Sequence, residues 1–121
     1  MFGIGIDAVD IDRFRAVLAR RPGLESRLFT DDERSHLSER ADAVPSLAAR
    51  FAVREATMKA LGVGIGAFDF HDVSVDIHAT GAPTLKVQGR AAALAAQAGV
   101  SAWHVSMSHT DSVAMAVVAA L

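Results

Sequence analysis

Apolar and polar positions alternate over several stretches of the chain, and each of these stretches predicts a β-strand. Residues 2–9 alternate and are rich in branched side chains, which predicts a strand that ends near Asp7. Residues 70–87 predict a β-hairpin whose turn lies at residues 81–83, where glycine and proline come together. Residues 103–121 predict a closing pair of strands.

Other segments carry apolar residues at helical spacing, with start or stop signals at their ends. The predicted helices cover residues 11–21, a segment that begins at Thr30, residues 46–61 and residues 89–99. Thr30 and Glu33 form a capping box, in which each side chain accepts a hydrogen bond from the other residue's backbone N–H. Gly62 is placed to end the third helix in the left-handed conformation, and Pro22 stops the first.

The order of elements is therefore strand, helices, strands, helix, strands. Short hairpin connections favour an antiparallel sheet with helices packed on it, which is an α+β fold. The chain has 121 residues, so we expect a single domain over residues 1–121.

Composition and charge exclude several classes of protein. Hydrophobic residues make up 51% and charged residues 21%, which is ordinary for a globular chain and excludes disorder. A net charge of -2 gives no drive toward nucleic acid or an anionic membrane, and no cysteine is present for disulfides or thiolate metal sites. No stretch resembles a signal peptide or is long enough to span a bilayer, so we expect a cytoplasmic protein. The mean hydropathy of +0.28 is a weak indication of an oligomer.

Two features of the sequence place charged side chains where they could take part in binding or catalysis. Asp7 interrupts an apolar strand, so its carboxylate must be paired, exposed or bound to a metal; alternatively it caps the following helix. Glu55 and Lys59 are four residues apart and share a helix face, where they form either an exposed ion pair or part of a site. Arg50 and Arg54 lie close by, and cations beside one carboxylate suit an anionic ligand that carries a divalent metal.

Two further features are open to a functional or a purely structural interpretation. His109 falls at the end of a strand, where it is either a ligand-binding residue or an exposed turn histidine. Between Arg13 and Arg27 the chain has five arginines and one acidic residue, Glu25. This segment either binds an acidic partner or phosphate, or forms the solvated face of an amphipathic helix.

Several motifs together resemble those of the holo-acyl-carrier-protein synthases, the short, single-domain 4'-phosphopantetheinyl transferases. The motifs are GIGIDAVDIDRF at the start, FT-x-x-E from Phe29 to Glu33, RFAVREATMKALGVGIG from Arg50, and WHVSMSHTDSVAMAVV near the end. They keep the family's order and span nearly the whole chain. The chain departs from the family in having Arg54 where lysine is usual and Phe51 where tryptophan is common.

The resemblance implies a reaction and a metal site. The enzyme would transfer the 4'-phosphopantetheine group of coenzyme A to a serine of apo acyl carrier protein and release adenosine 3',5'-bisphosphate. Asp7 and Glu55 would hold Mg²⁺ against the pyrophosphate, and Lys59 would neutralise phosphate oxygens. Whether the carrier belongs to fatty-acid or polyketide synthesis stays open.

The resemblance also implies how the substrates bind. Ser108, His109 and Thr110 would contact the nucleotide part of coenzyme A, and Arg50 would meet its 3'-phosphate, with Arg54 as a further cation. The carrier protein would dock on the first helix through the charged and apolar side chains of Arg13, Val17, Leu18, Arg20 and Arg21. Family members are homotrimers with sites between subunits, so the same assembly is expected here.

Two other functions remain open from the sequence. One is a coenzyme A or nucleotide-binding module without transfer activity, and the other is a structural α+β oligomer.

Overall fold

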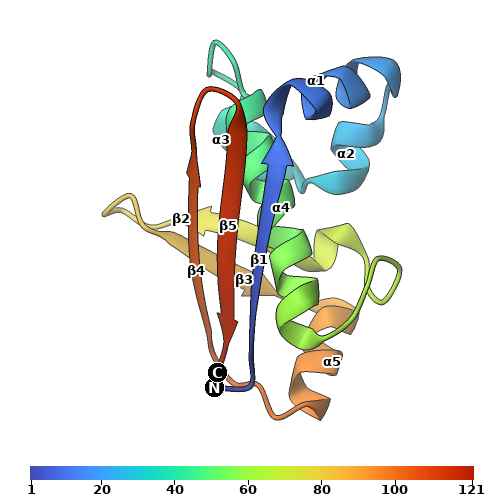
Figure 1. Ribbon diagram of the computed structural model, residues 1–121, viewed down its shortest axis with the longest axis vertical. Coiled ribbons are helices and arrows are strands. Elements are labelled where there is room, and N and C mark those ends of the chain that lie inside the picture. The colour runs from blue at the N-terminus through green and yellow to red at the C-terminus, as the bar shows by residue number, and fades with distance from the viewer.

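The computed structural model describes residues 1–121 and contains both predicted kinds of element (Figure 1). The strands are β1 (Gly3–Asp10), β2 (Val73–Ile77), β3 (Pro83–Val87), β4 (Trp103–His109) and β5 (Val113–Ala120). The helices are α1 (Ile11–Arg20), α2 (Leu24–Leu28), α3 (Asp31–Leu37), α4 (Val44–Leu61) and α5 (Gly89–Gln97), with a 3-10 turn, η1, at Phe70–Asp72. No helix combines the length and the apolarity that crossing a membrane requires.

The strands form two separate antiparallel sheets. One sheet has three strands in the order β1-β5-β4, and the other is the β2-β3 hairpin. In the three-stranded sheet, Asp7 of β1 lies opposite Ala116 of β5, which lies opposite Met107 of β4. Strand β5 therefore stands between the two edge strands, and the chain termini lie together at one end of the sheet (Figure 1).

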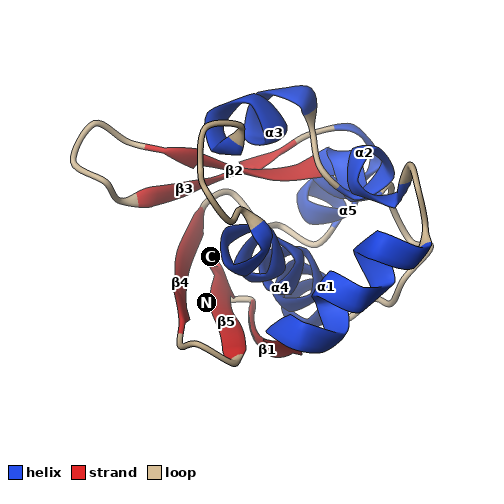
Figure 2. Cartoon of the chain, turned by 90° about the horizontal axis from the view of Figure 1, so that it is seen from above, coloured by secondary structure: helices blue, strands red, loops and turns tan.

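Helix α4 is the centre of the molecule. Viewed from above, it is enclosed by the three-stranded sheet, the β2-β3 hairpin and the other helices (Figure 2). Between Ser46 and Leu61 only three side chains reach the surface, namely Phe51, Glu55 and Lys59. Because these positions are four residues apart, they form one narrow stripe along an otherwise buried helix.

Two glycines of β1 allow α4 to pack directly on the strand's backbone. A Cβ atom built on Gly5 would lie 1.9 Å from the carbonyl oxygen of Ala56, and one on Gly3 would lie 2.1 Å from that of Ala60. Any larger residue would push the helix away from the strand. The small residues on both elements thus hold α4 against the half of β1 that leads to Asp7.

On the opposite face of the three-stranded sheet, β1 and β5 form an uncovered apolar patch, while β4 carries His104, Ser106 and Ser108 there. Ile4, Ile6 and Met115 are 61%, 68% and 39% exposed, and small or aliphatic side chains lie between them. Monomeric proteins rarely leave such a patch on a sheet open to water, so this face has the character of a protein interface.

The α+β class and most of the elements agree with the sequence prediction. The capping box of Thr30 and Glu33 is present, and Gly62 ends α4 with φ of 73°. The expected sheet is divided in two, α4 begins two residues before the predicted Ser46, and the sequence analysis missed the short helix α2.

The predicted end of the first strand was wrong. Strand β1 continues past Asp7 to Asp10, and it is Asp10 that caps α1 by accepting a hydrogen bond from the Arg13 N–H at 2.8 Å. The alternative role of Asp7 as a helix cap is therefore excluded.

We predict that Gly5→Ala destabilises the fold, because the added methyl group would overlap the Ala56 carbonyl and force α4 away from β1. The free energy of unfolding should fall by about 2–3 kcal/mol or more, measured by urea denaturation. Gly64→Ala is the matched control, since open space surrounds Gly64, and it should change stability by less than about 0.5 kcal/mol. Equal stability of the two variants would contradict the close packing of α4 on β1.

Candidate active site

The structure brings Asp7, Glu55 and Lys59 to one place. Asp7 comes from β1, whereas Glu55 and Lys59 belong to the open stripe of α4. The Lys59 ammonium donates to the Ile6 carbonyl at 2.9 Å and to the Asp7 carboxylate at 3.1 Å. Lys59 therefore pairs with Asp7 across the two elements and does not form the exposed pair with Glu55 that the spacing alone allowed.

The carboxylates of Asp7 and Glu55 lie close enough for their like charges to repel each other. Burial raises the pKa of Glu55, and the nearby charge of Asp7 raises it further, while Lys59 opposes both. Repulsion between two acidic groups is relieved when a cation binds between them. Mg²⁺ favours one or two carboxylates together with water and phosphate oxygens, so Asp7 and Glu55 fit this ion.

Asp7 and Glu55 line a cavity of about 540 Å³, here named the large cavity. Its walls are mainly aromatic and aliphatic, and three arginines and Asp10, the cap of α1, also line it. The apolar lining includes Val9, Phe14, Val17, Leu24, Leu28, Phe51 and Phe70, and the arginines are Arg13, Arg21 and Arg27. The cavity thus combines a carboxylate pair, an apolar wall and a cationic border.

Only some of the residues expected to dock the carrier protein line this cavity. Arg13, Val17 and Arg21 line it. Leu18 instead packs against the buried cluster under α1, and Arg20 is exposed but does not line the cavity. We therefore keep Arg13, Val17 and Arg21 in the proposed docking surface and remove Leu18, which contributes to the core.

Arg54 is not at the site with its neighbour Glu55. Its side chain is completely buried, and its two terminal nitrogens donate to the carboxylate of Glu33 at 3.1 and 2.5 Å. The Arg54 Nε donates to the carbonyl oxygen of Phe70 at 2.8 Å. All of its strong donors are satisfied inside the protein, which corrects the expectation that Arg54 binds the cofactor.

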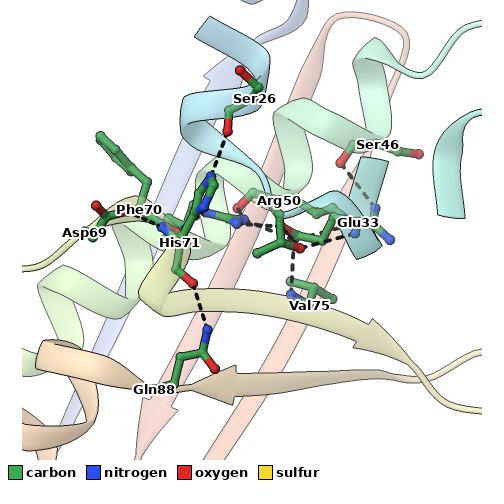
Figure 3. A network of polar contacts seen from close by, with 11 residues as sticks. Ser26, Glu33, Ser46, Arg50, Asp69, Phe70, His71, Val75 and Gln88 are labelled. Atoms are coloured by element: carbon green, nitrogen blue, oxygen red, sulfur yellow. Dashed lines mark hydrogen bonds and ion pairs between the residues drawn. The ribbon is translucent and has the colours of Figure 1, made fainter. Parts of the chain in front are cut away.

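Glu33 is the acceptor at the centre of this buried network (Figure 3). It also accepts hydrogen bonds from the backbone N–H groups of Thr30 and Val75, at 3.0 and 3.1 Å. Burial alone would raise the pKa of Glu33, but the hydrogen bonds and charge of Arg54 and these N–H groups outweigh it and hold that pKa below its usual value. Glu33 is therefore a structural anion in the folded protein.

Arg50 lies on the other side of α4, beside a second cavity of about 370 Å³, here named the arginine cavity. Its side chain is buried, and its Nε is the single buried side-chain polar atom without a hydrogen-bond partner. The nearest carboxylate oxygen, on Glu33, is 4.0 Å from this nitrogen. A buried donor without a partner, next to a cavity, is a position where an anion would gain a hydrogen bond.

The lining of the arginine cavity supports binding of an anion. Its cationic and hydrogen-bonding side chains are His36, Arg40, Ser46, Arg50, Ser108 and His109. No acidic side chain lines it. Thr110 does not reach this cavity, because its hydroxyl accepts hydrogen bonds from the Ser112 and Val113 N–H groups in the β4-β5 turn.

Sequence reasoning missed His36, Arg40, Arg27 and Phe70. His36 lies on the short helix α3 and Arg40 follows that helix. Nothing in the sequence connects either residue with β4. Arg27 belonged to the recognised arginine-rich segment, but the helix that carries it was not predicted. Phe70 was read only as the start of the hairpin, and no pattern in the sequence connects it with Phe14 and Phe51.

Comparison with known proteins gives one consistent result. Residues 3–118 match the family model described as the 4'-phosphopantetheinyl transferase superfamily. The chain is similar to a holo-[acyl-carrier-protein] synthase of Streptomyces avermitilis, with 48% identity over 99% of this chain and 97% of the relative. The crystal structure of the Neisseria meningitidis enzyme of that name has a TM-score of 0.91 at 29% identity, covering 100% of this chain and 98% of the other. The Helicobacter pylori enzyme in complex with coenzyme A has a TM-score of 0.85 at 28% identity, covering 98% and 99%.

We predict that Glu55→Gln stabilises the metal-free protein at neutral pH. A raised pKa means that ionising Glu55 costs stability in the folded state; this cost is complete above the folded pKa and disappears below the unfolded value of about 4.3. Because the carboxylate is partly solvated, the melting temperature should rise by only about 1–2 °C at pH 7 and should not change near pH 4.

The measurement is thermal unfolding with a chelator present. Glu39→Gln, at an exposed position without such neighbours, is the control and should leave the melting temperature unchanged at both pH values. A lower melting temperature for Glu55→Gln at pH 7 would mean that the Glu55 charge is paired favourably, which contradicts the repulsion described above.

Proposed function

The chain belongs to the 4'-phosphopantetheinyl transferase superfamily, and we propose that it is a magnesium-dependent holo-acyl-carrier-protein synthase. In this reaction a serine oxygen of apo acyl carrier protein forms a bond to the β-phosphorus of coenzyme A. The bond from that phosphorus to the bridging pyrophosphate oxygen breaks. Adenosine 3',5'-bisphosphate leaves, and the serine proton is released.

The observation that carries this proposal is the meeting of Asp7 and Glu55 in the large cavity, with Lys59 bound to Asp7. Asp7 and Glu55 would hold Mg²⁺, which stabilises the negative charge that grows on the phosphates as the bond breaks. Lys59 is the one cation on the open stripe of α4, and its side chain is 54% exposed, so its ammonium can also contact phosphate oxygens. Since phosphoryl transfer depends mainly on position and charge, these three groups supply what the chemistry requires.

The remaining walls of the large cavity suit the carrier protein. Arg13, Arg21 and Arg27 provide positive charge for an acidic partner, and the aromatic wall provides an apolar contact. Charged residues of this kind mainly accelerate encounter, so association should weaken as salt is added. The exposed Arg20 belongs to the same positive surface.

The nucleotide part of coenzyme A would bind in the arginine cavity. The unpaired Nε of Arg50, together with Arg40, would receive the 3'-phosphate, and Ser108 and His109 line the same space. This assignment keeps Arg50, Ser108 and His109 from the sequence analysis and adds Arg40.

The two cavities lie on different sides of the protein, which supports a shared site. The large cavity includes Asp7 of β1, whereas the arginine cavity includes Met107 of β4, and Ala116 of the central strand β5 lies between these two positions. Helix α4 likewise carries Glu55 on its open stripe and Arg50 on its buried side. We propose that one coenzyme A joins the large cavity of one subunit to the arginine cavity of its neighbour.

A homotrimer provides this arrangement. Packing the outer face near β1 of one chain against the β4 side of the next is a head-to-tail contact, and such contacts form a ring when the rotation between subunits closes. The exposed apolar patch of β1 and β5 carries Ile4, Ile6 and Met115 and supplies the surface that the ring would bury.

The transfer itself is tested by incubating the protein with coenzyme A, Mg²⁺ and apo acyl carrier protein and measuring the carrier's mass. We expect the carrier to gain the phosphopantetheine group, and we expect Asp7→Asn to slow turnover on the order of a hundredfold or more. Asp31→Asn, at an exposed position on α3, should retain normal turnover. A melting temperature raised by coenzyme A without any transfer would instead indicate a binding module, and neither effect would indicate a structural protein.

The shared site is tested by mixing two impaired variants, Asp7→Asn and His109→Glu, so that subunits assemble randomly. A site that takes Asp7 from one subunit and His109 from the next is intact in about a quarter of cases, so transfer at limiting coenzyme A should recover to about a quarter of the wild-type rate. Each variant assembled alone serves as the control. Absence of recovery in the mixture would mean that each site is built within one chain.

A further inference from the structure

Three aromatic rings in a row form part of the wall of the large cavity. The ring centroids of Phe14 and Phe51 are 5.3 Å apart, and those of Phe51 and Phe70 are 6.1 Å apart. Phe14 and Phe51 stand on helices α1 and α4. Phe70 stands on η1, a turn of three residues that follows the glycine-rich loop. The position of this third ring therefore depends on how η1 is attached to the rest of the protein.

No residue of η1 is fully buried, and only the Phe70 ring packs against the two buried clusters of the core. Hydrogen bonds hold the backbone of the turn in addition (Figure 3). The Phe70 carbonyl oxygen accepts from the buried Arg54 at 2.8 Å, and the His71 Nε2 lies 2.7 Å from the Ser26 carbonyl oxygen. Asp69 caps the turn through the His71 N–H. Of these contacts, the bond from Arg54 is the one that reaches the backbone of Phe70 itself.

Arg54 can hold Phe70 firmly because its other end is fixed. Its terminal nitrogens bind both oxygens of Glu33, and its guanidinium carbon lies 5.0 Å from the centre of the Phe29 ring. The planar guanidinium directs Nε and the terminal nitrogens to different acceptors at once. A lysine has a single ammonium nitrogen, which cannot occupy both the place beside Glu33 and the place beside the Phe70 carbonyl.

We propose that Arg54 is a positioning residue for the large cavity: it anchors the Phe70 carbonyl to the buried Glu33 and so sets the place of the Phe70 ring that an apolar side chain of the carrier protein contacts. The role of the ring rests on the proposed function, whereas the anchoring does not. Arg54 acts through Phe70 and touches neither substrate. It should therefore affect the carrier protein and not coenzyme A, whose phosphates are held by other residues.

The first test is steady-state kinetics of Arg54→Lys, which keeps the charge beside Glu33 and removes the bond to Phe70. Losing one hydrogen bond that positions a contact should raise KM for the carrier on the order of fivefold, with KM for coenzyme A unchanged. Arg90→Lys is the matched control, because the Arg90 Nε also donates to a backbone carbonyl, that of Ala67 at 3.0 Å, at a position outside the large cavity. It should leave both KM values unchanged.

A double-mutant cycle separates positioning from general loss of structure. Phe70→Leu should also raise KM for the carrier, and adding Arg54→Lys to it should produce little further change, because the ring to be positioned is gone. If Arg54→Lys does not fold, Arg54→Gln is the second variant: it leaves Glu33 in place beside Arg50, cannot reach Glu33 and the Phe70 carbonyl together, and should give the same rise in KM for the carrier. An unchanged carrier KM, additive effects, or an equal rise in both KM values would each overturn the proposal.

Hydrogen exchange of the substrate-free protein tests the anchoring independently of transfer. Amides of residues 70–73 should exchange faster in Arg54→Lys than in wild type or Arg90→Lys, because η1 loses its attachment to α4. Unchanged exchange would overturn the anchoring whether or not the protein transfers phosphopantetheine. If wild type transfers nothing although exchange changes as expected, the proposed function fails and only the carrier part of this inference fails with it.

Discussion

Helix α4 lies against strand β1 at a separation that only glycine permits, and the geometry of the site depends on this contact. The backbone of β1 at Gly3 and Gly5 touches the carbonyl oxygens of Ala60 and Ala56, one turn apart on the helix. Asp7 is the next residue of β1 on the same face, and Glu55 and Lys59 immediately precede those two alanines. The packing of four small residues therefore decides that the three charged groups meet. It also explains why Lys59 can reach both the Ile6 carbonyl and the Asp7 carboxylate.

Adjacent residues of α4 have opposite electrostatic roles because each step along a helix turns by about 100°. Arg54 points inward, where the fold requires that every charge be paired and hydrogen-bonded, and Glu33 supplies that partner. Glu55 points to the open stripe, where its charge stands beside that of Asp7 without a counterion of its own, a state that burial makes more costly. The buried ion pair joins α3 to α4, while the two carboxylates that repel each other are suited to bind a cation. One helix thus provides both the rigid support and the reactive surface.

Features that depend on local chemistry were predictable from the sequence. The capping box at Thr30, the glycine that ends α4 and the spacing of Glu55 and Lys59 all follow from neighbouring residues. The orientation of α4 was not predictable, because a helix that is buried almost all round has no polar face to indicate its direction. For the same reason, Arg54 was assigned to the site together with Glu55. The family resemblance identified Asp7 and Glu55 as partners, but only the packing explains how residues so far apart in the sequence meet.

The separation of the two cavities follows from the same central helix. A helix enclosed by sheets and other helices can carry functional side chains on two sides, but residues on those sides cannot meet within one chain, because the helix and strand β5 lie between them. A ligand as long as coenzyme A would need both a carboxylate pair and a cationic pocket, and this fold offers each at a different edge of the same sheet. A second copy of the chain would pack on the apolar patch that β1 and β5 form on the outer side of that sheet. It would thereby place its own arginine cavity beside the large cavity of the first copy. In this interpretation, one interface has two effects: it brings the two cavities together into a complete site, and it removes Ile4 and Ile6 from water.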